Sequence, residues 1–210
     1  MRVLIADDHA IVRKGLAQLI REEFPDSEIQ EAANSPEVLE KVKIGIFDAI
    51  LIDISMPGRN GLETLKQIRD FGIKAPILVI SMHPEEQYAV RVLKAGASGF
   101  LNKDSATEEL ITAFHKVISG KKYISASLAE KMAERFESSS EKPLSDLLSD
   151  RELQVLQLIA SGKTVGIIAD EISLSVNTIS TYRARILEKL NLANNAELMR
   201  YALDNGLIQL

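Results

Sequence analysis

The chain has 210 residues, of which 46% are hydrophobic and 26% charged, and 25 basic against 30 acidic side chains give a net charge of −5 at pH 7. This composition is typical of a globular protein with one or two cores, and it excludes an intrinsically disordered chain. The negative net charge excludes a nucleic-acid-binding protein with a generally basic surface, but it does not exclude a basic patch on one face. The apolar runs are far shorter than the roughly 20 residues of a membrane helix, no secretory leader is expected, and the absence of Cys excludes disulfides and fits a reducing compartment.

The first 120 residues alternate short apolar runs with longer segments of helical period, which predicts an α/β domain. The expected strands are Arg2–Ala6, Glu28–Ala33, Ala49–Asp53, Pro76–Ser81 and Gly99–Asn102. The expected helices are Ala10–Glu23, Pro36–Val42, Gly61–Asp70, Glu85–Ala95 and Thr107–Ser119. Right-handed crossovers would join the five strands into a doubly wound parallel sheet, with the more polar second strand at an edge.

No strand pattern follows Gly120. A segment of linker composition, Ser138–Pro143, comes after a possible amphipathic helix at Ala126–Phe136. Four helices are expected beyond it, at Asp150–Ala160, Thr164–Ile172, Val176–Leu190 and Ala196–Asn205, and the short step between the second and third is what a helix-turn-helix requires. We therefore predict an α/β domain over residues 1–120, a partly helical linker over 121–143 and an all-α helix-turn-helix domain over 144–210.

Acidic side chains end two of the predicted strands. Asp7 and Asp8 follow the first strand, and Asp53 ends the third. If these strands are neighbours, three carboxylates converge at the carboxyl edge of the sheet, and their repulsion favours a shared divalent cation, most naturally Mg²⁺. A lone Asp at a strand end is more often a turn former, but three at matched ends favour a site.

Two further strand ends carry groups suited to phosphate. Ser81 offers a hydroxyl, and Lys103 offers a cation that could pair with a phosphoryl oxygen. With the carboxylates they suit phosphoryl transfer to an aspartate, whereas a glycine-rich phosphate loop after the first strand is absent from the sequence. We interpret His9, beside two acids, as a local polar contact, and His83 and His115 offer no metal-ligand spacing with it.

Five residues at the strand ends, Asp7, Asp8, Asp53, Ser81 and Lys103, stand in order within four motif segments. The segments are Asp7-Asp8, Leu51-Ile52-Asp53-Ile54-Ser55-Met56-Pro57-Gly58, Ser81, and Phe100-Leu101-Asn102-Lys103. Through them residues 1–120 resemble the receiver domain of two-component response regulators. The resemblance implies that Asp53 accepts a phosphoryl group from a phosphohistidine on a sensor histidine kinase. Asp8, Asp53 and the backbone carbonyl of Ser55 would bind Mg²⁺, with Asp7 acting mainly through water.

The same resemblance assigns roles to the other strand ends. Lys103 would hold the phosphoryl group, and Ser81 would bond to it after moving inward. Phe100 matches the aromatic switch position, although a core aromatic on the fifth strand explains the residue equally well. Asp104 replaces the Pro that follows the lysine in many receivers, so a cis peptide there cannot be carried over.

The matching segments of the second domain are Leu148–Leu156, Ile168-Ala169, Ser175–Ile179, Ile186 and Lys189-Leu190. With them residues 144–210 resemble the LuxR-type helix-turn-helix that ends response regulators of the NarL family. The DNA-binding residues implied on the third helix are Asn177, Thr178, Ser180, Thr181, Tyr182, Arg183, Arg185 and Lys189. Ser180 and Tyr182 depart from the common Lys and His of the family, so base contacts cannot be carried over.

Residues 144–210 hold six basic and eight acidic side chains, a net charge of −2. Because DNA affinity depends on phosphate neutralisation, we expect a weakly binding monomer that gains from dimerisation. The expected protein is a cytoplasmic response regulator without a membrane segment. It is not expected to be an enzyme beyond its own phosphoryl transfer and dephosphorylation, and it is expected to form a homodimer when phosphorylated.

Two alternatives stay open. The first is a Mg²⁺-dependent phosphatase, although Ser55 stands where such enzymes usually carry a second acid. The second is a helical domain that binds protein instead of DNA.

Overall fold

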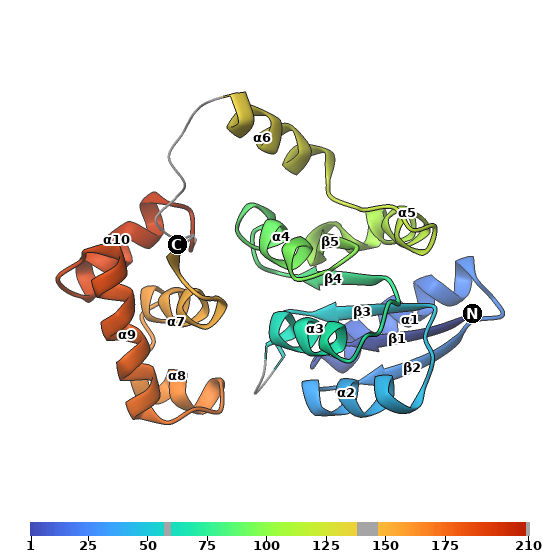
Figure 1. Cartoon of the computed structure of the whole chain (residues 1–210), viewed down its shortest axis with the longest axis horizontal. Coiled ribbons are helices and arrows are strands. Elements are labelled where there is room, and N and C mark those ends of the chain that lie inside the picture. Colours follow the sequence, from blue (N-terminus) through green and yellow to red (C-terminus); the bar gives the residue numbers. More distant parts are fainter. Residues whose placement is uncertain (57–59, 138–146, 209–210) are drawn as a thin grey trace. The chain divides into compact units, whose positions relative to one another are not determined.

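The structure is a computed structural model, and it describes residues 1–56, 60–137 and 147–208, except for the side chains of residues 135–137 (Figure 1). The chain divides into two compact units, Met1–Glu137 and Ser138–Leu210. Within the described ranges, no helix is both long and apolar enough to cross a membrane.

The first unit is built on a five-stranded parallel sheet with helices on both faces (Figure 1). Its strands are β1 (Arg2–Ala6), β2 (Glu28–Ala32), β3 (Ala49–Asp53), β4 (Ile77–Ser81) and β5 (Gly99–Asn102). The strand order is β2-β1-β3-β4-β5, so β1 and β3 are neighbours and β2 lies at an edge. Every residue of β3 and β4 is buried, whereas β2 is partly exposed. The predicted doubly wound parallel sheet is confirmed.

Helices cover the two faces of this sheet. They are α1 (Ala10–Glu23), α2 (Ser35–Ile44), α3 (Gly61–Asp70), α4 (Glu85–Lys94) and α5 (Ala106–Ile118), with a 3-10 turn, η1 (Lys103–Ser105), before α5. Apolar side chains of α1 and α5 pack with β1 and β3 in one core, in which Ile20 and Phe114 are fully buried. Asn34 and Asn60 begin α2 and α3, because each side chain accepts a hydrogen bond from a backbone N–H in the first turn.

The first unit continues past residue 120. Tyr123 pairs with β5: its N–H donates to the carbonyl of Ser98 at 2.9 Å, and its carbonyl accepts from the N–H of Phe100 at 3.1 Å. The next helix, α6 (Ala126–Glu137), belongs to the same compact unit. The sequence placed these residues in a linker over 121–143, and part of that linker lies outside the described residues; the three-part division stays a prediction.

The second unit is helical in the part that the structure describes. Its helices are α7 (Asp150–Ala160), α8 (Val165–Glu171), α9 (Val176–Leu190) and α10 (Asn195–Asp204). Helix α7 packs against α9 and α10, and Ile179, Ile186 and Leu190 of α9 are buried. The turn between α8 and α9 passes through Ser173, whose φ of 53° is left-handed. The predicted all-α domain with a helix-turn-helix is confirmed.

Candidate functional site

Acidic side chains from two neighbouring strands meet at the carboxyl edge of the sheet. Asp7 follows β1 and Asp53 ends β3, and the register pairs Ala6 with Ile52, so the two strand ends are level. Asp7 and Asp53 are 1% and 2% exposed, whereas Asp8 is exposed. One ligand atom from each of four residues lies within 4.8 Å of the others: Asp7, Asp8, His9 and Asp53. The structure thus brings the predicted carboxylates together.

Lys103 joins this cluster from the end of β5. Its Nζ lies 2.6 Å from Oδ2 of Asp7 and 2.9 Å from Oδ2 of Asp53. Burial raises the pKa of Asp53, and this effect is only partly opposed by Lys103. Burial alone would lower the pKa of Lys103, but the two carboxylates outweigh it and raise that pKa. The lysine is therefore cationic at neutral pH and neutralises part of the buried negative charge.

The acidic cluster fits a small hard cation. Oδ1 of Asp53 is buried and accepts no hydrogen bond from the described residues, so one carboxylate oxygen at the centre of the cluster is available to a ligand. Carboxylate oxygens are the donors that Mg²⁺ prefers. Nδ1 of His9 lies 2.8 Å from Oδ1 of Asp8 and 3.3 Å from Oδ1 of Asp7, which agrees with the interpretation of His9 as a local polar contact.

Ser81 ends β4 and is fully buried. Its Oγ accepts a hydrogen bond from the backbone N–H of His83 at 3.0 Å. The His83 ring stacks on Tyr88, with centroids 4.7 Å apart, and its Nε2 lies 3.1 Å from Oγ of Ser55. Burial, and then the charge of Lys103, lower the pKa of His83. Sequence reasoning considered His83 only as a metal ligand and missed this contact, although its position two residues after Ser81 is a signal that could have shown it.

Phe100 is fully buried in β5, next to Val79 of β4 in the register. Its backbone N–H is the donor to Tyr123, so the strand that carries it also holds the chain segment after α5. Both interpretations of its side chain, core aromatic and switch residue, fit this position, and the switch role stays a prediction.

Helix α9 carries the residues predicted to contact DNA. Five are exposed: Asn177, Ser180, Thr181, Arg185 and Lys189. Three are half-buried: Thr178, Tyr182 and Arg183. Ser175 begins the helix, because its Oγ accepts the N–H of Thr178 at 3.0 Å. The same hydroxyl lies 2.8 Å from Oγ1 of Thr178, so this predicted contact residue also belongs to the start of the helix.

Both units match known protein families. Residues 3–115 match the response regulator receiver domain, and residues 146–202 match the bacterial regulatory proteins of the luxR family. The chain belongs to the response regulators. Its receiver domain is followed by a LuxR-type DNA-binding domain, as the resemblance in sequence implied.

Similar proteins span the whole length of this response regulator. The response regulator UvrY of Escherichia coli (strain K12) is 33% identical over 209 residues, which cover 99% of this chain and 95% of UvrY. The oxygen regulatory protein NreC of Staphylococcus epidermidis is 35% identical over 217 residues and the full length of both chains. A structure of RcsB from Salmonella enterica serovar Typhimurium, bound to a promoter in the presence of the phosphomimetic BeF3−, is 27% identical, with a TM-score of 0.60 and coverage of 96% of this chain and 97% of that one.

Two of the predicted DNA-binding cations in this response regulator contact its own chain. Nζ of Lys189 donates to Oε2 of Glu152 at 2.7 Å and to the carbonyl of Leu147 at 3.3 Å. Nε of Arg183 donates to Oδ1 of Asn195 at 2.6 Å. These contacts fix α9 against α7 and the start of α10, and they do not exclude phosphate contacts; the roles of both cations toward DNA stay predictions.

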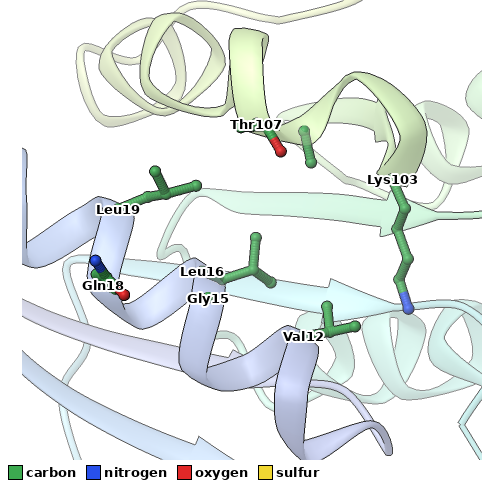
Figure 2. Close-up of a pocket in the computed structure, with 8 residues that line it drawn as sticks. Val12, Gly15, Leu16, Gln18, Leu19, Lys103 and Thr107 are labelled. Carbon is green, nitrogen blue, oxygen red and sulfur yellow. The ribbon is translucent and has the colours of Figure 1, made fainter.

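An apolar hollow of about 360 Å³ lies between α1 and α5 of the receiver domain (Figure 2). Its lining residues are Val12, Gly15, Leu16, Gln18, Leu19, Lys103, Ala106 and Thr107. Lys103 stands at one end of it and also contacts Asp53, so the hollow borders the acidic cluster.

Proposed function

We propose that this response regulator accepts a phosphoryl group on Asp53 from the phosphohistidine of a sensor histidine kinase, and that phosphorylation controls promoter binding by α9. One observation carries the first part: the Asp53 carboxylate is buried among Asp7, Asp8 and Lys103, and its Oδ1 is available to a ligand. Such a site suits the transfer of phosphate to a carboxylate, because that reaction depends on positioning and charge neutralisation.

Mg²⁺ is the cation that this donor set fits. Asp8, Asp53 and the backbone carbonyl of Ser55 would hold it, with Asp7 acting through water. When bound, the ion neutralises charge on the carboxylates and on the incoming phosphoryl oxygens. Burial raises the pKa of Asp53, and the nearby cation of Lys103 opposes this rise and so favours the ionised, nucleophilic carboxylate.

In the transfer step, Asp53 forms a P–O bond as the P–N bond of the phosphohistidine breaks. The phosphoryl group adds about −2 charge at neutral pH, which Lys103 pairs with as it turns from the carboxylates toward the new oxygens. The Ser81 hydroxyl then turns from His83 toward the phosphoryl group. Phe100 follows it as the aromatic switch. The chain promotes this transfer and its own dephosphorylation only, and we propose no further enzymatic activity.

The second part of the proposal is the response to phosphorylation. Phosphorylated receivers would pair, and two LuxR-type domains would then place two α9 helices on promoter DNA in the cytoplasm. Pairing doubles the number of phosphate contacts, which a domain with a net charge of −2 needs. The RcsB structure, bound to a promoter with a phosphomimetic present, supports this mode of action by similarity.

Mass spectrometry of the intact protein tests the phosphoacceptor. After incubation with acetyl phosphate and Mg²⁺, we expect one added phosphate on the wild type and none on Asp53→Ala. Asp104→Ala is the matched control, because Asp104 is an exposed acid in η1, next to Lys103, and its loss should leave the modification intact. An unmodified wild type, or equal modification of Asp53→Ala, would contradict the assignment.

A further inference from the structure

Helix α6 begins at Ser125 with an incomplete set of capping bonds of its own. Oγ of Ser125 accepts the N–H of Leu128 at 3.0 Å, which is one half of a capping box. The other half needs a Glu or Gln at the position of Leu128 to accept the N–H of Ser125. A leucine cannot accept that bond, so the bond must come from elsewhere in the fold.

The missing acceptor comes from the first turn of α4. Oε1 of Glu85 accepts the N–H of Ser125 at 3.0 Å, and Oε2 accepts its hydroxyl proton at 2.5 Å. Nearly two turns after Ser125, Lys131 of α6 forms an ion pair with Glu86. Two consecutive residues of α4 therefore hold the start of α6, 40 residues later in the chain.

The segment that leads into α6 is fixed on its other side by β5. The two backbone bonds of Tyr123 flank Gly99, and the Tyr123 hydroxyl contacts Glu109 of α5. Gly99 permits this approach, because a Cβ there would lie 2.9 Å from Cβ and from the carbonyl oxygen of Tyr123. The position of the segment on β5 is thus fixed by backbone contact. Its polar contact with α4 includes the carboxylates of Glu85 and Glu86, next to the buried Leu128 of α6.

These two side chains stand next to the part of the receiver that must move. Glu85 lies two residues after His83, whose N–H donates to the Ser81 hydroxyl. When Ser81 turns toward a phosphoryl group on Asp53, that bond is lost and the loop before α4 is released. The residues nearest to the loop on α4 are Glu85 and Glu86.

We propose that phosphorylation of Asp53 loosens the contact of Glu85 and Glu86 with Ser125 and Lys131, and so frees the start of α6. Helix α4 then transmits the state of the phosphoacceptor to the chain segment that leads to the DNA-binding unit. The unmodified receiver holds α6 in place, and the modified receiver releases it. This inference rests on the proposed function for its trigger, but the contact itself exists without phosphate.

Hydrogen exchange of the full-length protein, followed on peptides from α6, tests the contact first without phosphate. Loss of the two hydrogen bonds to the Glu85 carboxylate is expected to cost about 1 to 2 kcal/mol, which corresponds to roughly 5- to 30-fold in the opening equilibrium. We therefore expect exchange of α6 amides to be about that much faster in Glu85→Ala than in the wild type. Glu108→Ala is the matched control: it removes an exposed acid from the first turn of α5, so α6 should exchange as in the wild type.

A second variant separates the contact with α4 from the cap of α6 itself. Asp caps a helix as well as Ser does, so Ser125→Asp keeps an acceptor for the N–H of Leu128. It also puts a carboxylate against Glu85 and removes the hydroxyl donor. We expect Ser125→Asp to exchange as fast as Glu85→Ala. Wild-type exchange in Ser125→Asp, or in Glu85→Ala, would overturn the contact.

The trigger is tested by adding acetyl phosphate and Mg²⁺, with the intact mass of each sample measured in parallel. We expect phosphorylated wild type to reach the α6 exchange rate of Glu85→Ala, and phosphorylated Glu85→Ala to show no further change. Added phosphate with unchanged α6 exchange would overturn the coupling and leave the phosphoacceptor in place. No added phosphate would instead count against the proposed function.

Discussion

The carboxyl edge of the receiver sheet and helix α9 were both predicted from motifs, but they differ in what holds their residues. The residues of the acidic cluster come from three strand ends and touch one another, and Asp7 and Asp53 at its centre are buried. The residues of α9 come from one helix, and most of them face away from the core. A buried cluster has its geometry set by the fold. The exposed residues of a helix acquire their contacts from a partner. A motif match therefore predicts the geometry of a buried cluster better than it predicts the contacts of exposed residues on a helix.

The largest expected effect is the loss of Lys103 in the buried cluster. Lys103→Met leaves Asp7 and Asp53 without their cation, and removing one partner of a buried pair costs about 3 to 5 kcal/mol. Hydrogen exchange of β1 and β3 peptides without Mg²⁺ measures the free energy of unfolding of the first unit. Lys74→Met, at an exposed lysine, should leave it unchanged.

The pH dependence of this loss has a definite sign. Burial raises the pKa of Asp53, and removing Lys103 raises it further, so the folded variant favours the protonated carboxyl. Stability of the variant is lost as pH rises through that pKa and is regained below the ordinary value of 3.8. The difference from wild type should therefore shrink as pH falls toward 3.8. A constant difference would show that Lys103 stabilises the unit by packing alone.

The sequence could predict the acidic cluster because strand ends are local signals. Each of Asp7, Asp53 and Ser81 follows an apolar run, and parallel strands with right-handed crossovers bring such ends to one edge. The contacts of Tyr123 with β5 gave no such signal, because a single bridge has no periodic pattern. Nor did the contact of Glu85 with Ser125, since both residues are ordinary at helix starts and only the tertiary fold brings them together.

In the second unit too, contacts between residues close in sequence could be predicted, whereas contacts between residues far apart in sequence could not. The spacing of Ser149 and Glu152 in the sequence is typical of a capping box, and both of its hydrogen bonds are present. That the second partner of Glu152 is Lys189 could not be predicted, because 37 residues separate them. The resemblance implied that Lys189 contacts DNA, and the structure shows that its side chain also donates a hydrogen bond to Glu152 within the domain.

Substitution of Lys189 should have the next largest effect on stability. It tests whether all the predicted DNA-binding residues of α9 are surface residues, or whether Lys189 also stabilises the domain. Lys189→Ala leaves the buried Glu152 carboxylate short of a partner, which costs about 1 to 3 kcal/mol. Burial raises the pKa of Glu152, but Lys189 and Ser149 outweigh it, so the pKa lies below its usual 4.5. The stabilisation is therefore present above pH 4.5 and is lost as pH falls through the folded pKa.

Chemical denaturation, followed by hydrogen exchange of α7 and α9 peptides, measures this difference at neutral and acidic pH. Arg185→Ala is the matched control on the same helix, since Arg185 is exposed and its loss should leave stability unchanged. If Lys189→Ala unfolds like Arg185→Ala, the contact with Glu152 contributes nothing, and Lys189 belongs with the surface residues of α9.

DNA binding should show a smaller effect for each residue. The double variant Arg183→Ala, Arg185→Ala removes two cations from α9. We expect a loss of about 1 kcal/mol, or roughly fivefold in affinity, for each lost contact, and about 2 kcal/mol, or roughly 30-fold, for the double variant. The slope of log affinity against log salt concentration should fall by about 2, because each phosphate contact releases close to one counterion. Titration of promoter fragments at several salt concentrations measures both quantities.

Arg200→Ala is the control for this measurement, as it removes an exposed cation of the same unit from α10 instead of α9. Equal loss of affinity in the control and in the double variant would mean that net charge, not helix α9, controls binding. Unchanged affinity in the double variant would favour the alternative that the helical domain binds protein.

The smallest expected effect lies in the turn that places α9. Ser173 adopts φ of 53°, a conformation that costs a residue with a Cβ roughly 1 to 2 kcal/mol. Ser173→Gly removes that cost but increases the entropy of the unfolded chain, so we expect a net gain of about 0.5 kcal/mol in the stability of the second unit. Asn191, at φ of 53° after α9, is the comparison, because Asn tolerates this conformation and Asn191→Gly should gain less. Thermal denaturation measures both gains. Because neither substitution touches the exposed side of α9, DNA affinity should be unchanged in both, and an affinity that changed with Ser173→Gly alone would show that the turn, as well as the helix surface, determines binding.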